Sequence, residues 1–227
     1  MGTTSSMTRS RWSRTCATGA YPVAVTPTHL LVDLAGVLAT FDQEPRIAAL
    51  ARLSGLPEND VDERLYGSGF VDAADEGVFD ETEVRAGIVQ RLGLEGASAQ
   101  LDTAWMAAFD EDAAVLDVLD TAAAAGVGLL SNNDALVGSL IRTFLPGVAQ
   151  RCHAVVVSGV TGVRKPAAAA YQAGLTALGV DPARCVFVDD SSSNVEGGLA
   201  VGVDSVLFVN AGQLAEDLGR RGFGHPA

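Results

Sequence analysis

The residues of this chain that could carry out chemistry stand at the ends of short apolar runs. Asp33 closes the first run, Ser131 and Asn132 close the second, and Asp189 and Asp190 close the fourth. Carboxylates are the ligands that hard divalent cations prefer, and an ionised carboxylate can also act as a nucleophile. Hydroxyl and amide groups can bind anionic oxygens. The combination favours chemistry on an anionic group.

Lys165 is the only lysine of the chain and lies in the run Gly162–Pro166, after the third apolar run. All other basic residues, apart from histidine, are arginines. An ammonium is a compact point charge on a flexible stem, whereas a guanidinium is a broad planar fork. The lysine therefore predicts a place where one small positive charge is needed beside anionic oxygens.

Five apolar runs, rich in Val, Leu and Phe, would position these residues: His29–Asp33, Val127–Ser131, Ala154–Ser158, Cys185–Asp189 and Ser205–Val209. Such runs predict strands that are buried on both faces. Segments of helical length separate the later runs: Ala113–Ala125, Ala135–Leu145, Pro166–Leu178 and Ser193–Val201. The alternation predicts an α/β fold, with a parallel sheet flanked by helices. Ligands bind such sheets outside the carboxyl ends of the strands, so one crevice should collect the polar residues.

Four stretches resemble, in the right order, the motifs of the haloacid dehalogenase (HAD) superfamily of aspartate-nucleophile hydrolases: Leu30–Leu38, Leu129–Asn133, Gly162–Pro166 and Val186–Asp190. The resemblance extends from His29 to the C-terminal helix and implies the Rossmann-like fold of that superfamily. The Arg-Lys-Pro run, the Asp-Asp pair and the segment Leu65–Gly69 resemble the branch that includes bacterial sugar-1-phosphate phosphatases.

The resemblance implies a phosphatase that acts on a small phosphate ester, with a sugar phosphate as the expected substrate. Asp33 would attack phosphorus and form an aspartyl-phosphate, which water then cleaves. Ser131 and Asn132 would hold phosphoryl oxygens. Lys165 would neutralise charge between Asp33 and the phosphate.

The resemblance also implies a Mg²⁺ site, since a divalent ion lets one anion approach another. Its ligands would be Asp33, the backbone carbonyl of Ala35, and Asp190, with Asp189 as a further ligand or as an anchor. Two supporting residues would orient Asp190 and the Lys165 ammonium: Ser191 and Asn194.

Ala35 departs from the usual motif of these phosphatases, which place a second aspartate two residues after the nucleophile. Alanine can neither give nor take a proton, although its carbonyl can still bind a metal. General acid–base assistance is typically worth about 10²–10⁴-fold. The loss would matter least for acidic leaving groups, such as an anomeric or aryl hydroxyl.

Alanine at this position also occurs in two relatives that are not phosphatases. The first, phosphonoacetaldehyde hydrolase, needs a lysine in its cap, and the absence of any lysine there excludes it. A metal-independent 2-haloacid dehalogenase needs a cap arginine near the halide, for which the candidates are Arg46, Arg52 and Arg64. A catalytically silent HAD fold that binds a ligand or partner is the third alternative.

The segment 43–111 interrupts the alternation and contains no convincing strand. Its apolar residues recur at helical spacing in Ile47–Leu53, Val61–Leu65, Val84–Leu92 and Leu101–Phe109, and Asp80 with Glu83 resembles a capping box. We therefore expect a helical cap domain at 43–111 and a core domain formed by 28–42 and 112–227. Four residues could face the site from such a lid: Arg64, Tyr66, Ser68 and Phe70.

Composition narrows the partners and the compartment. The net charge of −13 argues against a nucleic-acid partner, and no apolar run is long enough for a membrane span. Three cysteines without paired spacing favour a reducing cytoplasm. Residues 1–27 carry three arginines and no acid, which predicts a disordered or mis-assigned extension. We expect a monomer or homodimer.

Overall fold

A computed structural model of the chain describes residues 26–95 and 99–224, so most of the expected N-terminal extension lies outside the described residues. The central sheet has five parallel strands in the order β5-β4-β1-β6-β7. They are β1 (His29–Val32), β4 (Gly126–Ser131), β5 (Ala154–Val157), β6 (Cys185–Asp189) and β7 (Asp204–Leu207). The predicted parallel α/β fold is therefore confirmed.

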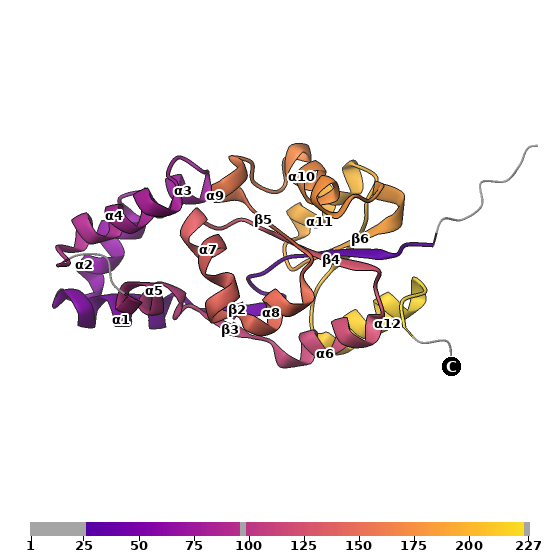
Figure 1. Cartoon of the computed structure of the whole chain (residues 1–227), viewed down its shortest axis with the longest axis horizontal. Coiled ribbons are helices and arrows are strands. Elements are labelled where there is room, and N and C mark those ends of the chain that lie inside the picture. Colours follow the sequence, from indigo (N-terminus) through magenta and orange to yellow (C-terminus); the bar gives the residue numbers. More distant parts are fainter. Residues whose placement is uncertain (1–25, 96–98, 225–227) are drawn as a thin grey trace, which may run out of the picture.

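Helices cover both faces of this sheet (Figure 1). On one face lie α10 (Ala168–Leu178) and α11 (Ser192–Ala200), and on the other lie α6 (Ala113–Ala122), α7 (Ala135–Phe144), α8 (Pro146–Arg151) and α12 (Ala211–Arg220). The side chains of successive residues of β1 pack into the cores on opposite faces of the sheet, because side chains alternate along a strand. Leu31 packs with Tyr171 of α10, whereas Leu30 and Val32 belong to the core that contains α6, α7 and α12.

A two-stranded antiparallel ribbon, β2 (Ala39–Phe41) and β3 (Phe109–Glu111), joins the sheet to a helical insertion. The expectation of no strand in 43–111 was wrong, and the helix expected at Leu101–Phe109 ends at Met106. Each strand of the ribbon has only three residues, and its partner is distant in sequence. No local sequence pattern therefore predicts either strand. The chain enters and leaves the insertion through this ribbon.

The helical insertion consists of α1 (Gln43–Ser54), α2 (Glu58–Asp62), a π-helical turn η1 (Glu63–Gly67), α3 (Phe70–Asp75), α4 (Glu81–Leu92) and α5 (Ala99–Met106). The expected capping box at the start of α4 is confirmed. The Asp80 carboxylate accepts hydrogen bonds from the amides of Thr82 and Glu83, and the Glu83 carboxylate accepts one from the Asp80 amide. No helix in the described ranges is both long and apolar enough to cross a membrane.

Arg46 is buried where the insertion meets the ribbon. Its guanidinium lies over the Trp105 ring, 4.2 Å from the ring centroid, and within 5.6 Å of the centroids of Phe41 and Phe109. Its Nε donates to the Trp105 carbonyl at 2.7 Å, and its Nη1 donates to the Tyr66 hydroxyl at 3.0 Å. Arg46 therefore ties α1, α5 and η1 to the ribbon by cation–π contacts and hydrogen bonds.

Gly159 permits a close contact between α9 (Ser158–Thr161), which follows β5, and the start of α7. A Cβ on Gly159 would lie 2.4 Å from the amide nitrogen of Ala135 and 2.6 Å from the carbonyl carbon of Asp134. Because both atoms are backbone, Gly159→Ala must move one of the two segments. We expect it to destabilise the fold by about 1–3 kcal/mol in urea unfolding.

The matched control is Gly219→Ala in α12, where no atom lies within 4 Å of the added methyl group. This change should be neutral or should stabilise the protein by up to about 1 kcal/mol, since alanine is the better helix former. Equal effects of the two substitutions would contradict the close contact at Gly159.

Candidate active site

Asp33 follows β1 and is buried at the carboxyl edge of the sheet, with 7% of its surface exposed. Its amide donates to the Val188 carbonyl at 3.0 Å, which continues the pairing of β1 with β6. One carboxylate oxygen, Oδ1, accepts from the Leu34 amide at 2.7 Å. Burial raises the pKa of Asp33 to about 7, the Lys165 ammonium opposes the rise, and Asp189 adds to it.

The Lys165 ammonium lies between two carboxylates. Its Nζ is 2.7 Å from Asp33 Oδ1 and 2.7 Å from Asp189 Oδ2, and the residue is only 4% exposed. One cation thus faces two anions from neighbouring strands. A fork of guanidinium size would not fit the same sealed position, in agreement with the choice of lysine.

The loop that carries Lys165 is fixed by Asn132. The Asn132 Oδ1 accepts from the Lys165 amide at 2.8 Å, and its Nδ2 donates to the Lys165 carbonyl at 2.9 Å. The Asn132 side chain is therefore occupied by backbone contacts, and the expectation that Asn132 holds phosphoryl oxygens stays a prediction. The helix expected from Pro166 begins only at Ala168, so Lys165 lies in the loop before it.

Ser131 ends β4 and is buried. Its hydroxyl oxygen accepts from the Asn133 amide group at 2.7 Å. Among the described residues no acceptor takes the proton of this hydroxyl, so it can donate to a bound oxygen.

Asp189 and Asp190 differ sharply in their surroundings. Asp189 is fully buried at the end of β6 and accepts hydrogen bonds from the Ser191 amide at 2.9 Å and from Asn194 Nδ2 at 3.0 Å. Asp190 is exposed. Ser191 and Asn194 therefore hold Asp189 and, through it, Lys165. The expectation that they also orient Asp190 stays a prediction.

Three carboxylates converge at this edge of the sheet. One oxygen from each of Asp33, Asp189 and Asp190 lies within 4.8 Å of the others. Such an oxygen-only donor set suits Mg²⁺. Burial, followed by the charge of Asp189, raises the pKa of Asp190. Like charges this close together favour binding of a cation.

The turn after Asp33 brings the backbone against Asp190. Gly36 has a φ of 82°, and a Cβ there would lie 2.2 Å from Asp190 Oδ2. Both the conformation and the space therefore require glycine at this position. Ala35 lies in the same turn, half-buried, and contributes only a methyl side chain.

The residues expected on the face of a lid mostly stabilise the insertion itself. Phe70 is buried beneath the Arg91 guanidinium, and Arg64 Nη1 donates to the Arg91 carbonyl. Ser68 Oγ donates to the Arg64 carbonyl, and Tyr66 accepts from the buried Arg46. Burial raises the pKa of the Tyr66 hydroxyl.

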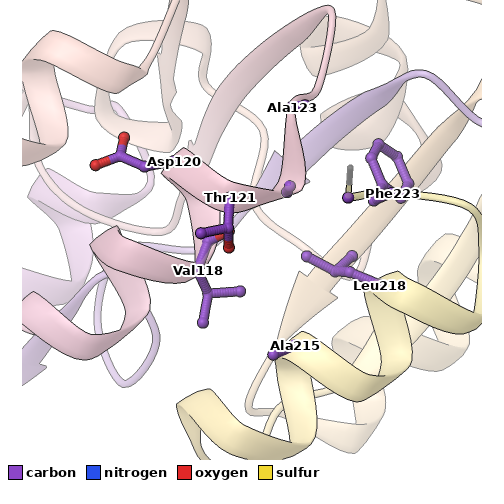
Figure 2. A pocket seen from close by; sticks show the side chains of 9 residues that line it. Val118, Asp120, Thr121, Ala123, Ala215, Leu218 and Phe223 are labelled. Carbon is purple, nitrogen blue, oxygen red and sulfur yellow. The ribbon is translucent and has the colours of Figure 1, made fainter. Parts of the chain in front are cut away.

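A separate pocket of about 380 Å³ lies between α6 and α12 (Figure 2). Its lining is largely apolar, with Val118, Leu218 and Phe223 pointing into it. The Asp120 carboxylate at its edge points away and is paired with Arg151. None of the polar residues clustered at the carboxyl edge of the sheet lines this pocket.

Comparison with known proteins gives consistent matches. A family model described as haloacid dehalogenase-like hydrolase matches residues 27–202. Phosphatase MT3486 from Mycobacterium tuberculosis is 30% identical over 201 residues, which cover 84% of this chain and 91% of that protein. D-ribitol-5-phosphate phosphatase from Bacteroides thetaiotaomicron is 26% identical over 200 residues, or 84% of this chain and 96% of that protein.

Among solved structures, a HAD family enzyme from Bacteroides thetaiotaomicron, bt-2542, has a TM-score of 0.65 and 25% identity. The match covers 79% of this chain and 93% of that one. That structure is a complex with magnesium and inorganic phosphate.

Proposed function

This chain belongs to the haloacid dehalogenase-like hydrolase family, and from that premise we propose that it is a Mg²⁺-dependent phosphatase of a small sugar or polyol phosphate. The observation that carries the proposal is the Lys165 ammonium 2.7 Å from both Asp33 and Asp189, beside the exposed carboxylate of Asp190. The matches to a phosphatase and to a polyol-phosphate phosphatase support it.

The proposed reaction uses Asp33 as the nucleophile. Its carboxylate attacks phosphorus, the ester bond breaks, and water then cleaves the aspartyl-phosphate. The Lys165 ammonium stabilises the negative charge that gathers between Asp33 and the phosphoryl group. The Ser131 hydroxyl donates a hydrogen bond to a phosphoryl oxygen. Asn132 contributes by fixing the backbone of Lys165.

The metal would be held by Asp33, Asp190 and the backbone carbonyl of Ala35. Asp189 fits the role of anchor better than that of ligand, because its oxygens already accept from Lys165, Ser191 and Asn194. When bound, Mg²⁺ would neutralise phosphoryl charge so that the anionic nucleophile can approach.

We further propose that the helical insertion acts as a cap domain over the core formed by 28–42 and 112–227. Its two connections to the core run through the β2–β3 ribbon, and Ser158 of the core donates a hydrogen bond to the Asp75 carbonyl at 2.6 Å. A cap in this position would exclude water from the crevice and select the substrate.

The geometry gives no support to a haloacid dehalogenase. Arg46 is sealed among aromatic rings, while Arg52 and Arg64 lie on the exposed surface of the insertion. In a site that works without metal, the three clustered carboxylates would repel one another, and among the described residues Lys165 would be the one cation beside them to offset this repulsion. Such a site would therefore be destabilised.

Metal removal tests the proposed function. Excess chelator should abolish phosphate release from p-nitrophenyl phosphate, by about 10²-fold or more, and added Mg²⁺ should restore it. Mg²⁺ should also raise the melting temperature of the wild type, since a ligand that binds only the folded state stabilises it. Asp190→Asn should lose most of that rise. Full activity in chelator would contradict the proposal.

A further inference from the structure

Ala35 leaves the proposed reaction without a proton donor beside the nucleophile. When the ester bond breaks, the leaving oxygen keeps the electron pair and needs a proton unless it is already a stable anion. A positioned acid supplies about 10²–10⁴-fold of rate in such steps. An ester with a poor leaving group therefore requires an acid from elsewhere around the crevice.

Most acidic groups near the carboxyl edge of the sheet already have another contact or role. Asp189 is fully buried and holds the Lys165 ammonium. Asp134 is buried as well, and its carboxylate caps α7. Asp190 belongs to the proposed metal site. Asp75 is different, because it is half-buried and no residue in the described ranges donates a hydrogen bond to its carboxyl group.

Asp75 is the last residue of α3 and is fixed against the core by backbone contacts. Its carbonyl accepts from the Ser158 hydroxyl, the first residue after β5, at 2.6 Å. Two residues later, Gly77 approaches Gly162 so closely that an added Cβ would lie 2.9 Å from the Gly162 Cα. The end of α3 therefore rests on the segment that leads to Lys165.

The charged groups that act on the Asp75 carboxyl belong to the segments after β4 and β5, to α1 and to its own helix. In order of influence they come from α7, the Lys165 loop, α1 and its own helix: Asp134, Arg164, Arg46 and Asp72. Glu76, the next residue, lies 3.9 Å from Arg164. Burial has the largest effect, and together these influences raise the pKa of Asp75 to about 7. A large share of the group is therefore protonated near neutral pH.

We propose that Asp75, supplied by the helical insertion, is the general acid and base that Ala35 cannot be. This inference rests on the proposed phosphatase function. In the first half-reaction, Asp33 bonds to phosphorus, the ester oxygen leaves with its electron pair, and the Asp75 proton passes to that oxygen to release an alcohol. In the second, water attacks phosphorus, Asp75 takes a proton from the water, and the bond between Asp33 and phosphorus breaks.

Two substrates that differ in their leaving group test this role. With a sugar 6-phosphate, whose alkoxide is a poor leaving group, Asp75→Asn should lower kcat by about 10²-fold or more. With p-nitrophenyl phosphate, whose leaving group needs no proton, the burst of nitrophenolate released in the first half-reaction should stay within about threefold of the wild-type rate. The second half-reaction, which both substrates share, should slow with either of them. Asp72→Asn is the matched control, an exposed carboxylate on the same helix, and should change neither rate appreciably.

The pH profile and a rescue separate catalysis from folding. The wild-type rate on the sugar 6-phosphate should fall as pH rises through about 7, where Asp75 loses its proton, and Asp75→Asn should lack that fall. Ala35→Asp in the Asp75→Asn background should recover the alkyl substrate, because an acid is again present.

Equal losses in the first half-reaction of both substrates, or a wild type that hydrolyses only the aryl ester, would overturn the role of Asp75 and leave the phosphatase proposal standing. No metal-dependent hydrolysis of either ester would overturn both.

Discussion

Asp33→Asn is expected to remove catalytic turnover while the protein stays folded. The amide keeps the shape of the side chain and can still accept from the Leu34 amide, but it is too weak a nucleophile to form the phosphoryl intermediate. We expect kcat on p-nitrophenyl phosphate to fall by a factor of about 10⁴ or more.

The charge balance at the site explains why the fold should survive this change. In the metal-free protein one ammonium faces two buried carboxylates, and Asp33→Asn leaves a one-to-one pair of Lys165 with Asp189. Thermal unfolding in chelator at pH 8 should show no loss of stability. Asp204→Asn, at a surface ion pair with Arg221, is the matched control and should retain full turnover. An Asp33 variant with more than a small fraction of wild-type turnover would mean that the nucleophile is another group.

Lys165→Met should damage both activity and stability. It removes the cation that stabilises charge at the phosphoryl group, which we expect to cost about 10²–10³-fold in kcat. It also leaves Asp33 and Asp189 buried without their partner, and breaking a buried ion pair in this way costs about 3–5 kcal/mol. Urea unfolding in chelator at pH 8 measures the second effect.

The loss of stability in Lys165→Met should depend on pH with a definite sign. Folding already raises the pKa of Asp33 above its value in the unfolded chain, and removing the ammonium raises it further. The deficit should therefore shrink as pH falls and the carboxyl takes up a proton, and it should grow as pH rises through 7.

Two controls bracket this prediction. Arg221→Met breaks a surface pair with Asp204 and should cost at most about 1 kcal/mol. Lys165→Arg keeps the charge but not the shape, and it should not recover activity. A fully active Lys165→Arg protein would show that only the charge matters at this position.

Much of the fold could be predicted because its signals are local. The strands at His29 and Cys185 are continuous apolar runs, and the capping box from Asp80 to Glu83 spans four residues. The convergence of Asp33 with Asp189 and Lys165 followed from the rule that parallel strands share one carboxyl edge. The structure places the Lys165 ammonium within hydrogen-bonding distance of both carboxylates.

The remaining features depend on contacts between distant segments. The β2–β3 ribbon needs Phe41 to meet Phe109, and no pattern in either triplet predicts that. Asn132 reaches the Lys165 backbone, although its motif alone suggested a ligand contact. Arg46 was a candidate for a halide-binding arginine of the cap, and it is buried against aromatic rings. For Asp75 the sequence held no signal, because its surroundings come from four separate elements.

The central place of β1 also has a consequence for folding kinetics. His29 pairs with Gly126 on one side and with Cys185 on the other. During synthesis β1 emerges before the other strands, yet β4 follows only after the whole insertion and β6 only after most of the core. Such high contact order slows folding and leaves the apolar run at Leu30 unpaired meanwhile. We therefore expect chains truncated before residue 185 to aggregate rather than to form a partial core, as light scattering of the released fragments would show.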